Sequence, residues 1–206
     1  YILASKGVYT GHLAVNDERV IGRTSSDYIF ALDTETGTLL WEKKYPSSAM
    51  KGIILGNIFA INESGDLIGL DVNTGEEKWR VEYAGERNGI PNIWENDGKQ
   101  WIIAGGYDHG NNLIFCVDPA TGDVRWKSSV DGSTGLMAIG GDHALISKVI
   151  DIADSDNLYQ LKAYKFSPSG AENAWELPAE SAYQYRDSRL STFNDSIVYV
   201  KFFYHD

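Results

Sequence analysis

Two loops of the sequence carry residue types that could hold a metal ion or move a proton. The first, residues 151–157, places the carboxylates of Asp151, Asp154 and Asp156 within one short segment. Carboxylate oxygens are ligands that calcium prefers, but the spacing matches no EF-hand, because no glycine stands at the turn and no glutamate closes it. We therefore expect no metal here and interpret the segment as a solvated hairpin, with a calcium site as the alternative.

The second loop, residues 105–112, is rich in glycine and asparagine and contains His109 beside Asp108. A histidine next to a carboxylate could act as a general base. The same composition is what a long glycine-rich hairpin needs, and we prefer that interpretation. The four histidines of the chain do not have the spacing of a metal site. The sequence therefore predicts no catalytic residue.

Aromatic residues in the connections between strands are the best candidates for a binding surface. They are Trp94, Tyr107 with His109 in the glycine-rich loop, and Tyr183 with Tyr185. Tryptophan, tyrosine and arginine are residues that protein interfaces favour. The alternative for Trp94 and Tyr183 is a place in the core on an inner strand.

These candidates must be positioned by a unit that repeats along the chain. The pattern Asp-x-x-Thr-Gly-x-x-x-Trp occurs three times, and a looser fourth copy contains Ser169, Gly170 and Trp175. Successive tryptophans, at positions 41, 79, 126 and 175, are 38, 47 and 49 residues apart. A period in this range is typical of repeat architectures. The three full copies contain Asp33, Gly37 and Trp41; Asp71, Gly75 and Trp79; and Asp118, Gly122 and Trp126.

Each copy indicates two antiparallel strands joined by a hairpin. A short apolar run precedes each aspartate, and aspartate, threonine and glycine suit the turn, where we expect the glycine to have a positive φ. The residue two positions before each aspartate is small, namely Ala31, Gly69 or Cys116, which suggests close approach of another strand or backbone. We expect Cys116 to be a buried small residue. Each tryptophan should fill the seam between neighbouring repeats.

Further short apolar runs precede each copy, so that one repeat holds about four strands in a meander. This organisation predicts an all-β fold, a β-propeller of four-stranded antiparallel blades in a single domain over residues 1–206. The blades are expected at approximately residues 12–45, 50–84, 89–130 and 135–178, with part of a fifth at 181–206.

The repeat resembles that of the pyrroloquinoline-quinone-type (PQQ-like) β-propellers, in the units that follow Leu32, Leu70 and Val117. The resemblance covers roughly residues 12–203. It implies that a tryptophan docks between adjacent blades at each copy, that is, Trp41, Trp79, Trp126 and Trp175. The fourth copy departs from the pattern, because Phe166 replaces the aspartate, Ser169 replaces the threonine, and one residue is inserted before the tryptophan.

Propellers of this family usually have seven or eight blades, so the resemblance implies that the chain is a fragment of a longer ring. The alternatives are a closed five-bladed ring and two half-rings that pair. An open end would expose strand edges and apolar surface, which another chain or further blades would have to cover.

The resemblance implies several functions rather than one. The family includes quinoprotein dehydrogenases, outer-membrane assembly lipoproteins, sensor domains and secreted proteins that bind no cofactor. The quinoproteins cover their cofactor with a disulfide between adjacent cysteines, whereas this chain has a single cysteine. Their calcium ligands have no counterpart that we can place. We therefore expect no cofactor, with pyrroloquinoline quinone and calcium as alternatives.

The net charge of −11 comes from scattered acidic residues and there is no basic stripe, which argues against nucleic acid as a partner. No apolar run is long enough to span a bilayer, so we expect no membrane insertion. We expect a non-catalytic scaffold that binds a protein or a glycan. By family resemblance alone it would work in the periplasm, in the cell envelope or outside the cell. The alternatives are part of a PQQ-dependent quinoprotein dehydrogenase and an outer-membrane assembly scaffold.

Overall fold

The computed structural model describes residues 13–45, 52–85, 89–153 and 156–178, together with the short stretches 183–184, 189–193 and 197–201. In these ranges every regular element is a β-strand. The same ranges contain no helix long and apolar enough to cross a membrane.

The strands form four antiparallel sheets in which neighbours along the chain are neighbours in the sheet. The first two sheets comprise β1 (Ala14–Val15), β2 (Arg19–Arg23), β3 (Tyr28–Asp33) and β4 (Leu39–Lys44), and then β5 (Gly52–Leu55), β6 (Ile58–Glu63), β7 (Asp66–Asp71) and β8 (Glu77–Val81). The third comprises β9 (Asn92–Asn96), β10 (Lys99–Asp108), β11 (Asn111–Val117) and β12 (Val124–Val130).

The fourth sheet is longer and carries an extra strand. It comprises β13 (Ser133–Gly140), β14 (His143–Ala153), β15 (Asp156–Ser167) and β16 (Gly170–Glu176), and β17 (Tyr183–Gln184) pairs with β15. A separate antiparallel pair is formed by β18 (Arg189–Phe193) and β19 (Ile197–Lys201).

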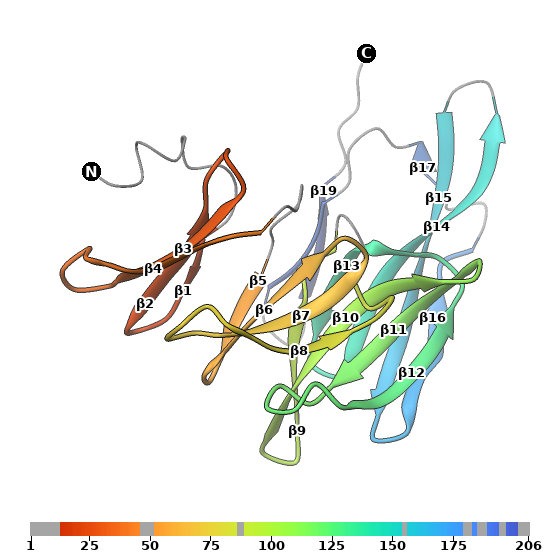
Figure 1. The fold of residues 1–206 in the computed structure, drawn as a ribbon. Coiled ribbons are helices and arrows are strands. Elements are labelled where there is room, and N and C mark those ends of the chain that lie inside the picture. Colours follow the sequence, from red (N-terminus) through yellow and green to blue (C-terminus); the bar gives the residue numbers. More distant parts are fainter. Residues whose placement is uncertain are drawn as a thin grey trace.

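The four sheets follow one another in chain order as the blades of a propeller (Figure 1). The first strands of neighbouring sheets contact each other, β1 with β5 and β9 with β13, and the outer strand β12 contacts β16. The apolar core lies between the sheets, in one cluster of buried side chains for each pair of neighbouring blades. The all-β propeller architecture that the repeat predicts is therefore confirmed.

The hairpins of the three full repeats have the backbone conformation that the sequence predicts. Gly37, Gly75 and Gly122 have φ angles of 67°, 68° and 78°. In the first copy the N–H of Thr36 donates to Oδ1 of Asp33 at 2.8 Å. Hydrogen bonds from the hydroxyl and the N–H of Thr36 lower the pKa of Asp33. The aspartate therefore fixes the turn, and the glycine supplies the left-handed position.

The small residue two positions before each aspartate lies opposite a residue of another strand, as expected. Cα pairing places Ala31 opposite Trp41, Gly69 opposite Trp79 and Cys116 opposite Trp126. A Cβ at Gly69 would lie 2.1 Å from the Trp79 ring. The close approach is thus made by the tryptophan of the adjacent strand in the same blade, and not by another backbone. Burial raises the pKa of the Cys116 thiol to about 12, as suits an inert core residue.

Candidate functional site

The first two seams between blades share one geometry. Trp41 and Trp79 are each 8 % exposed. The indole Nε1 of Trp41 donates to the carbonyl of Val72 at 2.9 Å, and that of Trp79 donates to the carbonyl of Pro119 at 3.0 Å. Both acceptors belong to the hairpin of the following blade, so each tryptophan joins two repeats.

The repeat glycines have a second role that the sequence pattern did not reveal. A Cβ at Gly75 would lie 2.7 Å from the Trp41 ring, and one at Gly122 would lie 2.6 Å from the Trp79 ring. Each glycine therefore lies directly against the tryptophan of the preceding blade. At Gly37 a Cβ would meet nothing within 4 Å, so this glycine is needed only for the left-handed φ of the turn.

The third seam is built differently. Trp126 is 7 % exposed, yet its Nε1 has no hydrogen-bond partner in the described part of the chain. Its ring packs against Trp94 and Phe166, with centroid distances of 6.2 Å and 5.9 Å. Phe166 stands where the repeat aspartate would be, so the altered fourth hairpin replaces a hydrogen bond by aromatic contacts.

One aromatic prediction needs correction, and another stays a prediction. Trp175 is 46 % exposed, and among the described residues no hairpin lies against it, so its place in a seam stays a prediction. Trp94 is 1 % exposed, and its Nε1 donates to Oδ1 of Asp142 at 2.8 Å. Trp94 is therefore a core residue of the third seam and presents no binding surface.

The proposed calcium ligands receive no support from the described residues. Asp151 and Asp156 lie on the paired strands β14 and β15, but the structure describes only their backbone, and Asp154 lies outside the described residues. Tyr183 is described only as backbone in β17, and Tyr185 is outside the described residues. No group of three metal-ligating side chains occurs in the part of the chain whose side chains are described.

The glycine-rich segment is a tight turn and not a long loop. The strands β10 and β11 pair as far as Asp108 and Asn111, and only His109 and Gly110 lie between them. These two residues have φ angles of 46° and 91°, which a two-residue hairpin turn requires. Nδ1 of His109 contacts the carboxylate of Asp108, so the two side chains meet in space. Tyr107, just before the turn, is 57 % exposed.

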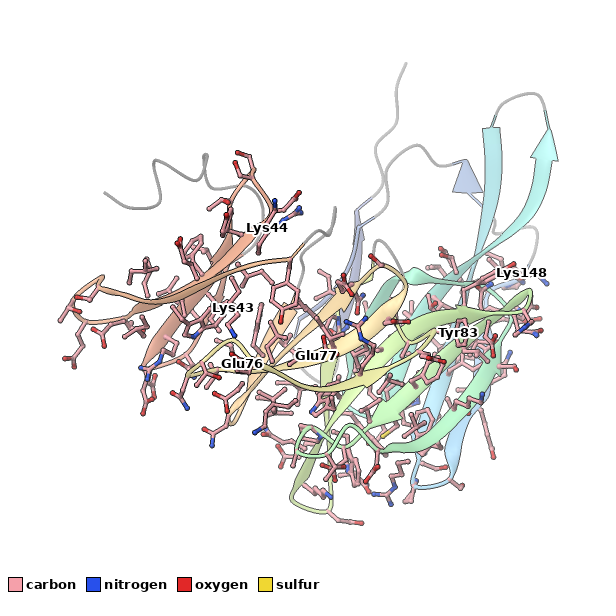
Figure 2. All side chains as sticks on the ribbon, in the orientation of Figure 1. Lys43, Lys44, Glu76, Glu77, Tyr83 and Lys148 are labelled. Carbon is pink, nitrogen blue, oxygen red and sulfur yellow. The ribbon has the colours of Figure 1, made fainter. Side chains whose placement is uncertain are left out.

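Tyr83, at the end of the second blade, contacts this turn. The sequence pattern did not predict the contact. Tyr83 follows β8, is 48 % exposed and has a φ of 62°, which is strained for a bulky side chain. Its N–H donates to Oδ1 of Asp66 at 3.2 Å, and its carbonyl accepts the N–H of Tyr107 at 3.2 Å. Its ring lies 6.2 Å from that of His109. In Figure 2 the Tyr83 label lies over the third sheet.

We call Tyr83, Tyr107 and His109 the rim cluster. A glycine in β10 makes it possible, because a Cβ at Gly106 would lie 1.9 Å from the Tyr83 carbonyl oxygen. Two blades therefore hold three exposed rings by backbone contacts at one edge of the propeller. Strained backbone that the surrounding structure enforces is typical of functional sites. The only sequence signal for this contact is the pair of glycines inside a strand.

The charges near the rim cluster are mostly acidic. Glu82 is exposed beside Tyr83, and the Asp108 side chain is 22 % exposed. Arg80 binds three carboxylates, with its guanidinium nitrogens 2.8 to 2.9 Å from Glu63, Asp66 and Glu77. The hydrogen bond from Arg80 to Glu77 is the main reason that the pKa of Arg80 is raised. In Figure 2, Glu77 lies near Glu76, which pairs with Lys43 of the first blade.

A buried lysine ties the third blade to the fourth. The Lys162 side chain is 8 % exposed, and its Nζ lies 2.7 Å from Asp131 and 2.9 Å from Glu176. Burial alone would lower the pKa of Lys162, but the two carboxylates outweigh it and raise the pKa. Hydrogen bonds from Lys148 and Lys162 lower the pKa of Asp131. Asp131 follows β12, so this network closes the connection between the two blades.

Comparison with known proteins places this architecture in a family. The family model described as outer membrane protein assembly factor BamB matches residues 3–140. Two curated relatives are the uncharacterized proteins RC0314 of Rickettsia conorii, 24 % identical over 158 residues, and RP232 of Rickettsia prowazekii, 26 % identical over 157 residues. Each match covers 68 % of this chain and 37 % of the relative, so the chain spans about a third of their length.

Solved structures show the same fold. BamB from Moraxella catarrhalis is 20 % identical with a TM-score of 0.58, and the match covers 95 % of this chain and 69 % of that one. Quinohemoprotein alcohol dehydrogenase from Comamonas testosteroni is 16 % identical with a TM-score of 0.56, over 88 % of this chain and 38 % of that one. At these identities the likeness shows the fold alone.

Proposed function

The chain belongs to the family of the outer membrane protein assembly factor BamB, and we propose on this premise that its propeller scaffold binds a protein partner through the rim cluster. The scaffold would act without catalysing a reaction, in the periplasm or the cell envelope. The family membership supports this location.

The observation that carries the proposal is the exposure of aromatic rings that the backbone holds in place. Tyr83 and Tyr107 are 48 % and 57 % exposed, whereas the seam tryptophans Trp41, Trp79 and Trp126 are 7 to 8 % exposed. A residue whose backbone is already held in place loses less conformational entropy on binding, and tyrosine is favoured in the centres of interfaces. The rim cluster therefore has the composition and the preorganisation of a protein-binding surface.

Site-specific photo-crosslinking tests the proposal. A photoreactive amino acid would replace Tyr83 or Tyr107, and a matched control would replace Val124, which is 41 % exposed. Val124 begins β12 beside the hairpin after Asp118, at the opposite end of the strands from the turn at His109. We expect the same protein to be crosslinked from positions 83 and 107 and not from 124. The purified partner should then lose affinity for a Tyr107→Leu variant.

Two results would contradict the proposal. One is a crosslinking pattern in which position 124 captures the partner and positions 83 and 107 do not. The other is enzymatic turnover, namely reduction of an electron acceptor by an alcohol or a sugar after the chain is loaded with pyrroloquinoline quinone and calcium. That second result would favour the quinoprotein dehydrogenase alternative.

A further inference from the structure

The rim cluster combines exposed aromatic rings with neighbouring carboxylates, and this combination selects one kind of partner. We propose that the cluster binds an extended, positively charged segment of a protein, with arginine or lysine side chains lying against Tyr83 and Tyr107. The inference rests on the proposed function and specifies the chemistry of the partner at the same site.

The first argument concerns the rings. A guanidinium or ammonium group is attracted to the face of an aromatic ring, and arginine also stacks on it. Tyr83 and Tyr107 come from neighbouring blades, and the N–H of Tyr107 donates to the carbonyl of Tyr83 at 3.2 Å. The two exposed side chains therefore start from adjacent backbone positions. They offer two binding positions for successive cationic side chains of one segment.

The second argument concerns charge. Glu82 is exposed next to Tyr83, and Asp108 is next to Tyr107. Two cations among the described residues of the surrounding strands are bound to carboxylates. Arg80 pairs with three of them, and Lys148, labelled in Figure 2, pairs with Asp131 at 2.7 Å. Glu82 and Asp108 therefore add negative charge at the rim cluster, within a chain whose net charge is −11. Such a field attracts a basic segment and repels an acidic one.

The third argument concerns rigidity. The turn at Tyr83 rests on Gly106, where a Cβ would come within 1.9 Å of the Tyr83 carbonyl oxygen. The N–H of Tyr83 is also bound by Asp66 at 3.2 Å. Because the backbone on both sides of Tyr83 is fixed, a partner does not have to order this backbone on binding.

The test uses a short fluorescent peptide that alternates arginine and serine, and its counterpart with glutamate in place of arginine. Fluorescence anisotropy would measure their affinities for the full chain at low and at physiological salt. We expect the arginine peptide to bind more tightly than the glutamate peptide, and more weakly as salt rises. Tyr107→Leu and Tyr83→Leu should each weaken the arginine peptide by about two- to five-fold, as expected for loss of an exposed cation–π contact. Tyr107→Phe, which keeps the ring, should bind as the wild type does.

A matched pair of charge variants distinguishes binding of the peptide at the rim cluster from general electrostatic attraction to an acidic protein. Glu82→Gln removes one charge beside the rim cluster. Glu35→Gln removes one charge from the exposed hairpin after Asp33, which lies in the first blade, away from the rim cluster. We expect only Glu82→Gln to weaken the peptide. Circular dichroism and a melting curve would verify that each variant is folded.

Equal affinities of the wild type and Tyr107→Leu, or equal effects of Glu82→Gln and Glu35→Gln, would overturn the inference. If the crosslinking at positions 83 and 107 nevertheless captures a protein, the proposed function stands and only the cationic chemistry of its partner is wrong. If that crosslinking also fails, the proposed function itself is contradicted.

Discussion

A glycine brings two blades into close contact both at the seams and at the rim of this propeller, but the effect on the aromatic side chain differs. At the first two seams, Gly75 and Gly122 leave room for a tryptophan ring, and the ring becomes 8 % exposed. At the rim, Gly106 leaves room for the backbone of Tyr83, and the ring above it stays 48 % exposed. In both places the missing side chain brings two blades into contact. The difference is that the seam buries the aromatic group, whereas the rim presents it.

This comparison separates the residues that make the fold from those available for function. The seam geometry recurs at the first two seams with the same residue types, and the third seam keeps the buried tryptophan. Within the described residues, the rim cluster occurs at one position. It has left-handed backbone at Tyr83 and His109, and its rings stay exposed. A large effect on stability is therefore expected from the seam, and a large effect on binding from the rim.

Replacing Trp79 with alanine should have the largest effect on stability. Loss of a buried aromatic side chain costs about 3–5 kcal/mol, and the hydrogen bond to Pro119 is lost with it. Chemical denaturation of the wild type and Trp79→Ala would measure the change in the free energy of unfolding. A variant that melts within about a degree of the wild type would refute the role of Trp79 in the seam.

Replacing Gly75 with valine should cost more than the same change at Gly37. Both positions have a left-handed φ, near 67° to 68°, so both variants store strain of about 1–3 kcal/mol. Only Gly75 also lies against a tryptophan, so crowding should add about 1–3 kcal/mol. Unfolding experiments on the two variants would separate strain from crowding. Equal losses of stability would mean that the contact with Trp41 contributes nothing.

Gly106→Ala should affect both stability and binding. The added Cβ would collide with the Tyr83 carbonyl oxygen and with Phe115, so we expect a loss of about 1–3 kcal/mol and a displaced Tyr83 turn. The arginine peptide should bind this variant more weakly than the wild type. Tyr107→Leu provides the comparison, since it should weaken binding while changing stability by less than about 0.5 kcal/mol. Wild-type stability and affinity in Gly106→Ala would show that the Tyr83 turn can be held in another way.

The smallest effect should come from the ionic network between the third and fourth blades. Because the pKa of Asp131 is lowered in the folded state, its ion pairs stabilise the protein above the unfolded pKa of about 3.9. That stabilisation is lost as the pH falls through the lower folded pKa. Asp131→Asn should reduce the free energy of unfolding by up to about 1 kcal/mol at neutral pH, and the difference should shrink as the pH falls through the lowered pKa of Asp131. A difference independent of pH would contradict the assignment.

The sequence was sufficient to predict the fold and the repeat positions, because both follow from local pattern. The φ angles at Gly37, Gly75 and Gly122 are positive as expected, and the four-stranded order holds in each of the first three sheets. The contact of Gly75 with the ring of Trp41 was not predicted. It joins residues of different repeats, and a pattern within one repeat carries no information on such a contact.

The rim was predicted only in part, for the same physical reason. Tyr107 and His109 were recognised as binding candidates from their composition, but Tyr83 was missed because its partner, Tyr107, is 24 residues away (107 − 83) in another blade. Trp94 was placed among the binding candidates, although it is buried by a hydrogen bond to Asp142 and by the ring of Phe166. The residue type alone does not tell whether an aromatic side chain near a short connection is exposed or buried.

Hydrogen–deuterium exchange on the complex with the partner recovered by crosslinking tests the central claim most directly. If the rim is the binding surface, binding should slow the exchange of backbone amides at Glu82, Tyr83 and the turn around His109. The hairpins after Asp33, Asp71 and Asp118, at the opposite edge, should exchange as in the free protein. Protection confined to those hairpins, with none at the rim, would contradict the account.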